Sequence, residues 1–319
     1  MGLKAVLLAG GTGGAKLSAG VQEEIGEGLT VIANTGDDIE LLGVYVSPDP
    51  DLCTYWLGGE IDPERGWGIK GDSFTVFERL VKLGAPDWFG LSDRDLATCL
   101  RRATLLAQGS RLTEVQLGIG AALGLQGKVL PMCDEPVRTR VNTTEHGWRG
   151  LQEYLIADRA GPEITAVELD GIERATVSAE VSAAIESADV IIVGPSNPVI
   201  SIGPILAVPG LRSLLAAAPA PVVAVSPFVA GRVIKGPTDK FMRAIGEEPS
   251  AAGVINTYGE LLDGIVIDAA DPDPPPSELP CTRFDTMMDD TQRRREVAAR
   301  TLDYCTSLRD RRSQPGSSA

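Results

Sequence analysis

The first 51 residues constrain the fold most, because they carry the pattern of a strand, a helix and a second strand. Two apolar runs of strand length, residues 3–9 and 29–33, flank a segment (15–25) whose apolar residues recur every four positions. A right-handed crossover makes two such strands parallel, so their carboxyl ends lie at the same edge of a sheet. Ligands of open parallel sheets bind at that edge. The residues that directly follow the two strands are therefore the first candidates for a functional site.

The first strand ends in a glycine-rich segment, residues 10–14, with the sequence Gly-Gly-Thr-Gly-Gly. Glycines let a ligand approach backbone N–H groups closely, and the N-terminus of the following helix favours a phosphate. The spacing does not match the Walker motif, and the third glycine of the dinucleotide fingerprint is missing. A tight turn without a ligand is the alternative, but five small residues exceed what such a turn needs. We therefore predict a phosphate-binding turn.

Four aspartates are expected at the same edge of the sheet. Asp37 and Asp38 follow the second strand, while Asp49 and Asp51 lie in a segment that two prolines are expected to hold as a short, stiff loop. Each one alone could be a turn residue, and Asp38 could cap a short helix. Together, next to a phosphate turn, unpaired like charges favour a bound cation. Carboxylates beside phosphate-binding glycines indicate a hard cation such as Mg²⁺.

Later apolar runs of strand length alternate with helical segments, which predicts a three-layer, Rossmann-like α/β fold with a doubly wound, mainly parallel sheet. We expect a single domain over residues 1–308 with a helical insertion at about 60–125, a proline-rich loop at 271–276, and a disordered tail at 309–319. The further predicted strands are 43–46, 128–132, 163–167, 189–193, 221–226 and 264–268, and predicted helices include 72–82, 211–218 and 291–308.

A second helix of the insertion is predicted to open at Ser92, which resembles a capping box with Asp95. Arg94 lies in its first turn, where a cation opposes the helix dipole. Either Arg94 pairs locally with Asp93 and Asp95, or its guanidinium binds the carbonyl or phosphate oxygens of a ligand. The inward face is expected to carry Leu96, Leu100, Ala103 and Leu106.

Composition excludes several classes of protein. A net charge of −15 argues against general nucleic-acid binding. No apolar run approaches the ~18 residues of a membrane span, and no leader precedes the first strand, so we expect a soluble, cytoplasmic protein. The single histidine, His146, excludes a multi-histidine zinc site within one chain, and no serine nucleophile elbow is present. Five scattered cysteines without a Cys-x-x-Cys pair predict free thiols.

An ordered set of motifs closely resembles the 2-phospho-L-lactate transferase family of coenzyme F-420 biosynthesis. The resemblance covers roughly residues 3–305. The motifs are Gly10-Gly11-Thr12-Gly13-Gly14-Ala15-Lys16-Leu17, Asn34-Thr35-Gly36-Asp37-Asp38, Ser47-Pro48-Asp49-x-Asp51, Trp67-Gly68, Asp93-Arg94-Asp95-x-Ala97-Thr98, Gly194-Pro195-Ser196-Asn197-Pro198 and Ser201-Ile202-Gly203-Pro204.

The resemblance implies a phosphoryl-type transfer. The family's acceptor is the deazaflavin 7,8-didemethyl-8-hydroxy-5-deazariboflavin, and its donor is guanosine diphosphate bearing a three-carbon acid on the outer phosphorus. The terminal ribityl hydroxyl attacks that phosphorus and GMP leaves, a reaction that depends on positioning and charge neutralisation. The resemblance also implies Mg²⁺ and a homodimer. Which acid the donor carries, lactyl, enolpyruvyl or glyceryl, does not follow from the sequence.

Site residues carry over from the family position by position. Asp37 and Asp51 match the metal and catalytic aspartates, and whether Asp51 also takes the hydroxyl proton is left open, since a metal-bound carboxylate is a weak base. The positions that match deazaflavin binding are Asp49, Asp51, Trp67 and Arg94. The positions that match binding of the donor nucleotide and its phosphates are Gly11, Thr12, Gly13, Gly14, Lys16, Asn34, Ser196 and Asn197.

Two other classes of protein remain as alternatives. One is a non-enzymatic, nucleotide-sugar-binding regulator resembling the gluconeogenesis factor, which shares a Gly-Gly-Thr-Gly turn but lacks the two aspartate motifs. The other is an NAD-dependent oxidoreductase, which the missing third glycine disfavours.

Overall fold

The computed structural model describes residues 2–272 and 278–312. Its central feature is a seven-stranded sheet in the order β14-β13-β10-β9-β1-β2-β5, in which every neighbouring pair is parallel. This confirms the predicted Rossmann-like, doubly wound fold. The strands are β1 (Ala5–Ala9), β2 (Leu29–Ala33), β5 (Lys128–Pro131), β9 (Val190–Val193), β10 (Val222–Val225), β13 (Gly264–Asp268) and β14 (Cys281–Phe284).

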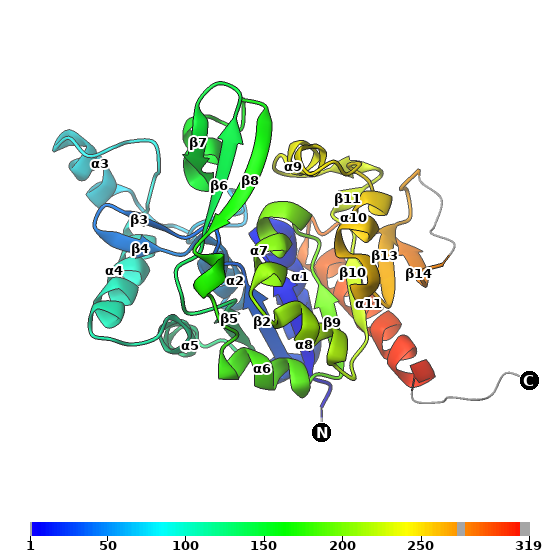
Figure 1. The fold of residues 1–319 in the computed structure, drawn as a ribbon. Coiled ribbons are helices and arrows are strands. Elements are labelled where there is room, and N and C mark those ends of the chain that lie inside the picture. Colours follow the sequence, from blue (N-terminus) through cyan, green and yellow to red (C-terminus); the bar gives the residue numbers. More distant parts are fainter. Residues whose placement is uncertain (1, 273–277, 313–319) are drawn as a thin grey trace, which may run out of the picture.

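Helices cover both faces of this sheet, because side chains that alternate along a strand point to opposite faces. In β1, Leu7 packs into one core cluster and Leu8 into the other. The helices of the Leu7 face are α1 (Gly11–Ile25), α2 (Pro48–Leu57) and α11 (Thr291–Arg312), and those of the Leu8 face include α6 (Ala179–Glu186), α7 (Gly203–Ala207), α8 (Leu211–Ala217) and α10 (Ala251–Tyr258). The result is a three-layer sandwich (Figure 1).

The segment 60–125 is helical, as predicted, whereas the segment 163–167 forms a strand outside the main sheet. Between 60 and 125 lie the helices α3 (Thr75–Lys82), α4 (Asp93–Ala107) and α5 (Leu112–Ala122). The segment 163–167 was predicted to join the parallel sheet, and this is wrong. It belongs to β8 (Ile164–Asp170), in a separate antiparallel sheet with β6 (Arg138–Thr143) and β7 (Gly147–Gly150). The half-exposed side chains of β8 explain this, since a strand inside a parallel sheet is covered on both faces.

Smaller elements complete the fold at the carboxyl edge of the sheet, which points upward in Figure 1. They are the hairpin β3 (Ile39–Leu41) with β4 (Val44–Val46), the hairpin β11 (Phe228–Val229) with β12 (Arg232–Val233), and α9 (Thr238–Ala244). The residues after Asp38, where a short helix was one alternative, form the strand β3, and the strand predicted at 43–46 pairs outside the main sheet. Short 3-10 segments lie at Gly26–Gly28, Ile172–Arg174 and Gly259–Leu261, and π-helical segments at Glu153–Ala157 and Pro198–Ile202.

Two predictions about the C-terminal region need qualification. The last helix does not end at Leu308 but continues to Arg312, so the predicted tail at 309–319 begins at least four residues too early. Residues 313–319 and most of the predicted proline-rich loop (273–276) lie outside the described part of the chain. No single helix in the described ranges has the length and hydropathy of a membrane span; only the bent pair Pro198–Ala207 and Leu211–Ala217 meets that test, across an 84° bend.

The helices α3 and α4 cap each other, which differs from the predicted box of Ser92 and Asp95. The carboxylate of Asp93 accepts hydrogen bonds from the first N–H groups of α3, at 3.2 and 2.9 Å. The carboxylate of Asp72 accepts hydrogen bonds from the N–H groups of Arg94 and Asp95 in α4, at 2.9 and 3.3 Å. Asp93, the first residue of α4, and Asp72, three residues before α3, thus take the place of local N-cap residues.

The inward face of α4 is also more polar than predicted. Leu96 is buried as expected, but Leu100 is 51% exposed, and the other buried residues are Cys99 and Arg102. Leu96 and Cys99 pack against the β3–β4 hairpin in a small apolar cluster, and Ala103 lies against it as predicted. Arg102 instead reaches Asp51 on α2, so the predicted inward face was correct at Leu96 and Ala103 and wrong at Leu100.

Candidate active site at the carboxyl edge of the sheet

The glycine-rich segment forms the first turn of α1 rather than a loop before it. The helix begins at Gly11, whose φ of +62° favours glycine, instead of at residue 15. The N–H of Gly11 donates to Oδ1 of Asp49 at 2.6 Å. A carboxylate therefore occupies a position at the helix N-terminus that suits an anion. Gly11 and Thr12 are partly exposed at this edge.

Gly13 and Gly14 are needed for close packing within the protein. A Cβ on Gly13 would lie 2.1 Å from the carbonyl oxygen of Pro195, and one on Gly14 would lie 2.5 Å from Oγ of Ser196. Neither residue has a positive φ. Their small size lets the start of α1 approach the segment after β9. Their phosphate-binding role stays a prediction.

Ser196 and Asn197 lie beside the start of α1, as the neighbouring positions of β1 and β9 require. Oγ of Ser196 accepts a hydrogen bond from the N–H of Gly10 at 3.3 Å. Oδ1 of Asn197 accepts from the N–H groups of Val199 and Ile200 at 2.9 and 3.3 Å. Both side chains therefore shape the loop between β9 and the following π-helical segment.

Asp49 and Asp51 lie in the first turn of α2, not in a loop as predicted. A proline at the first helical position has the φ that a helix requires, and carboxylates in the first turn complement the helix dipole. Both side chains are almost completely buried. Their different positions around the helix direct Asp49 toward α1 and Asp51 toward α4, because Asp51 pairs with Arg102.

One amide joins two of the candidate carboxylates. Nδ2 of Asn34 donates to a carboxylate oxygen of Asp37, to Oδ2 of Asp49 at 2.9 Å and to the carbonyl of Ile200 at 3.1 Å. Burial, and secondly the charge of Asp49, raises the pKa of Asp37 well above its usual range. Burial also raises the pKa of Asp49 to about 6. Two carboxylates held this close are costly when both are ionised, unless a cation lies between them.

Asp38 has a separate, structural role. Its carboxylate accepts hydrogen bonds from the hydroxyls of Tyr45 at 2.7 Å and Ser47 at 2.9 Å, and burial raises its pKa to about 7. It thereby fixes the β3–β4 hairpin against the loop after β2.

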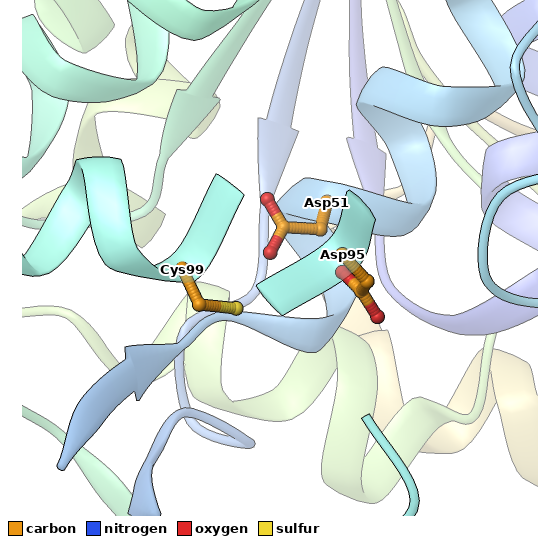
Figure 2. Close-up of side chains that lie close together, drawn as sticks. All are labelled: Asp51, Asp95 and Cys99. Carbon is orange, nitrogen blue, oxygen red and sulfur yellow. The ribbon is translucent and has the colours of Figure 1, made fainter. Parts of the chain in front are cut away.

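A buried polar cluster joins α2 to α4. Figure 2 shows Asp51 on α2 close to Asp95 and Cys99 on α4, and their potential metal-ligating atoms all lie within 4.8 Å of one another. Asp95 accepts a hydrogen bond from the hydroxyl of Tyr55 at 2.8 Å. Arg102 forms an ion pair with Oδ1 of Asp51, while Oδ2 of Asp51 is buried without a hydrogen-bond partner. Sequence reasoning missed Arg102; a charged residue in the register of a helix's buried face was the available signal.

The predicted acceptor residues Arg94 and Trp67 are exposed. The guanidinium of Arg94 donates to the carbonyl of Lys70 at 3.3 Å, and no ion pair with Asp93 or Asp95 is found in the described ranges. The local-pair alternative for Arg94 is therefore not seen. Trp67 is 44% exposed, with the guanidinium of Arg65 over its ring at 5.2 Å.

Lys16 is directed away from the glycine segment. Its ammonium donates to the carbonyl of Met288 at 2.8 Å and lies 5.9 Å from the centre of the Trp56 ring. Burial, followed by the charges of Arg294 and Lys235, lowers its pKa. These cations mark the α11 side of the α1 N-terminus as favourable for an anion.

Of the two carboxylate clusters in the site, one has side chains that suit Mg²⁺ and the other does not. The oxygens of Asp37 and Asp49 are the hard ligands that Mg²⁺ prefers, and both carboxylates are held close together by the amide of Asn34. The Asp51, Asp95 and Cys99 cluster includes a thiol, a poor ligand for Mg²⁺, and Arg102 already supplies a positive charge there. The two predicted metal ligands therefore lie in different clusters: Asp37 is beside Asp49, and Asp51 is beside Asp95 and Cys99.

Together, the helix N-terminus, the buried carboxylates and the flanking cations at one edge of a parallel sheet define a doubly wound α/β protein built to hold an anionic ligand. Comparison with known proteins then identifies the family. The family described as 2-phospho-L-lactate transferase CofD matches residues 5–299. The chain belongs to this family and is a transferase of the CofD type. Neither the regulator nor the oxidoreductase considered above agrees with that membership.

Individual relatives agree with this assignment. A 2-phospho-L-lactate transferase from Methanosarcina acetivorans is 38% identical over 298 residues, covering 92% of this chain and 96% of the relative. A phosphoenolpyruvate transferase from Kitasatospora aureofaciens is 43% identical over 276 residues, covering 84% and 86%. A crystal structure of a UPF0052 family member from Bacillus halodurans has a TM-score of 0.62 at 17% identity, covers 95% of this chain and 99% of that chain, and supports the fold alone.

Proposed function

We propose that this transferase moves a phospho-acid group from a guanosine-diphosphate-linked donor to the terminal ribityl hydroxyl of 7,8-didemethyl-8-hydroxy-5-deazariboflavin. The hydroxyl oxygen forms a bond to the outer phosphorus, the bond from that phosphorus to the bridging oxygen breaks, and GMP leaves. The observation that carries the proposal is the Asp37–Asn34–Asp49 network at the N-terminus of α1, beside the buried pair of Asp51 and Arg102. Reactions at a diphosphate need this combination of anion site and carboxylates.

The residues divide into a donor side and an acceptor side. On the donor side, the N–H of Gly11 would bind a phosphate oxygen after releasing Asp49, and Asp37 with Asp49 would hold Mg²⁺. When bound, the metal would neutralise charge on the diphosphate. On the acceptor side, the exposed Arg94 and Trp67 would bind the polar edge and the ring face of the deazaflavin.

The acid on the donor, the assembly state and the location are further parts of the proposal. Relatives are named both 2-phospho-L-lactate and phosphoenolpyruvate transferases, so both donors are candidates here. A homodimer follows from the family resemblance. A cytoplasmic location suits the five cysteines, all of which are free.

The test is a transfer assay with purified protein, deazaflavin, Mg²⁺ and each donor in turn, with the phosphorylated deazaflavin and GMP followed by chromatography and mass spectrometry. We expect equal amounts of the two products with at least one donor. An Asp37→Asn variant should lose transfer, while Asp87→Asn, on the exposed arm beside α3, should keep it. Product formation without GMP, or no product with either donor, would contradict the proposal. A thermal shift with UDP-sugar or NAD but not with GDP would favour the alternatives.

A further inference from the structure

The interface between α2 and α4 is built from ionisable side chains where apolar ones would be ordinary. On α4, Asp95, Cys99 and Arg102 recur at spacings of four and three, so they share one face. On α2, Asp51 and Tyr55 are four residues apart and face them. The apolar residues Leu96 and Ala103 lie on the adjoining face and pack against the β3–β4 hairpin.

Arg102 is the centre of this interface. Its side chain is completely buried, donates from Nη2 to Oδ1 of Asp51, and donates from Nη1 to the carbonyl of Tyr45 at 3.2 Å. The same Nη1 lies 4.0 Å from Sγ of Cys99. One guanidinium thus connects α2, α4 and the β3–β4 hairpin.

Stability alone does not explain such a residue. Removing two charges from water is expensive, and replacing a buried ion pair by apolar side chains of similar volume is often neutral or stabilising. Nε of Arg102 is buried without a partner, which adds to the cost. A pair kept under these conditions is better explained by what it does to Asp51.

We propose that Arg102 is a positioning residue for the transfer reaction, holding the Asp51 carboxylate in one orientation and locking α2 to the helix that carries Arg94. The inference rests on the proposed function. With Oδ1 bound by Arg102, Oδ2 of Asp51 is the oxygen left to accept a hydrogen bond from the ribityl hydroxyl. Arg94 is the second residue of α4. The ion pair between Arg102 and Asp51 therefore also fixes how far the Arg94 end of α4 lies from Asp51.

The planar shape of the guanidinium matters as much as its charge. Arg102 binds a carboxylate with one nitrogen and a backbone carbonyl with the other, in a fixed relation. A lysine ammonium at this place keeps the charge but not that geometry. Arg102→Lys therefore separates positioning from simple charge compensation.

The experiment compares Arg102→Lys with Arg101→Lys, a matched change at the neighbouring exposed position of α4. For each folded protein, kcat, the KM for deazaflavin and the Kd for GDP are measured. We expect Arg102→Lys to lower kcat at least tenfold while the Kd for GDP stays within threefold, and Arg101→Lys to change neither. Wild-type kcat in Arg102→Lys would overturn the inference while leaving the proposed function in place. Absence of transfer in the wild type would overturn both.

A second pair of variants covers the case in which Arg102→Lys does not fold. Arg102→Met leaves Asp51 buried and unpaired, so its melting temperature should fall clearly. Combining it with Asp51→Asn removes the uncompensated charge and should restore most of that loss. If the double variant is no more stable than Arg102→Met, the two side chains are not coupled and the inference fails.

Discussion

Replacing Gly13 by alanine should disrupt the site through sterics alone. Gly13 is the third residue of α1, and a Cβ there would lie 2.1 Å from the carbonyl oxygen of Pro195. A carbon–oxygen contact needs about 3.3 Å, so the start of α1 and the segment after β9 must separate by about 1 Å. Overpacking of this kind costs about 1–3 kcal/mol, while exchange of glycine for alanine in a helix returns up to about 1 kcal/mol. We expect a net loss of about 1 kcal/mol or more in the free energy of unfolding.

The same separation should widen the donor side of the site, so that the affinity for GDP falls at least tenfold. Urea denaturation measures the stability and calorimetric titration measures the GDP affinity. Gly118→Ala in α5 is the matched control, because its Cβ would meet nothing within 4 Å and its φ is not positive. This control should be stabilised slightly and bind GDP normally. A Gly13→Ala protein as stable as the control, with unchanged GDP affinity, would refute the steric argument.

Three further predictions concern single side chains. Arg94→Ala should raise the KM for deazaflavin at least tenfold, about 1.4 kcal/mol, with GDP affinity and melting temperature nearly unchanged because the side chain is exposed; equal losses for both substrates would contradict an acceptor role. Asp37→Asn should abolish Mg²⁺-dependent transfer without lowering the melting temperature at pH 8, since it removes a carboxylate whose pKa burial and Asp49 raise; a clear loss of stability would show that Asp37 is structural. Burial alone would raise the pKa of Asp268, but hydrogen bonds from Thr286 and two backbone N–H groups outweigh it and lower that pKa. The stabilisation by ionised Asp268 is therefore present above the unfolded pKa of about 3.9 and lost as the pH falls through the lower folded value. Asp268→Asn should lower the free energy of unfolding by about 2 kcal/mol at pH 7 and by progressively less below pH 4. A difference in unfolding free energy between wild type and variant that stays constant with pH would contradict this.

The parallel sheet could be predicted from sequence because its strands are buried on both faces and read as continuous apolar runs. The runs that became β1, β2, β9, β10 and β13 were found within a residue or two of their ends. The pairing of β1 with β9, which brings residues 10–14 and 194–197 side by side, does not follow from the order of the strands along the chain. The family resemblance alone had placed both segments at the nucleotide.

Features that depend on tertiary partners were not predictable in this way. The segment 163–167 has an ordinary strand composition, and only its pairing with β6 excludes it from the main sheet. The two prolines near Asp49 indicated a stiff loop, yet a proline at the first position of a helix is equally acceptable, and packing of α2 against α1 decides between them. The register of α4 could have marked Arg102 as a charged residue on a buried face, but its role depends on Asp51, 51 residues away in the chain, which no local pattern identifies.

The exchange of caps between α3 and α4 has a consequence for how the insertion opens. Asp93, the first residue of α4, holds the first turn of α3, and Asp72, in the segment just before α3, holds the first turn of α4. Fraying at the start of either helix therefore breaks a hydrogen bond to the start of the other helix or to the segment that leads into it. Amide protons at the beginnings of the two helices should therefore exchange with solvent at a common rate, as one cooperative unit. Loss of Asp72 would divide that unit, and the backbone N–H of Arg94 would become one of the fastest-exchanging positions in α4. Loss of Asp93 would do the same for the N–H groups of Thr75 and Val76 in α3.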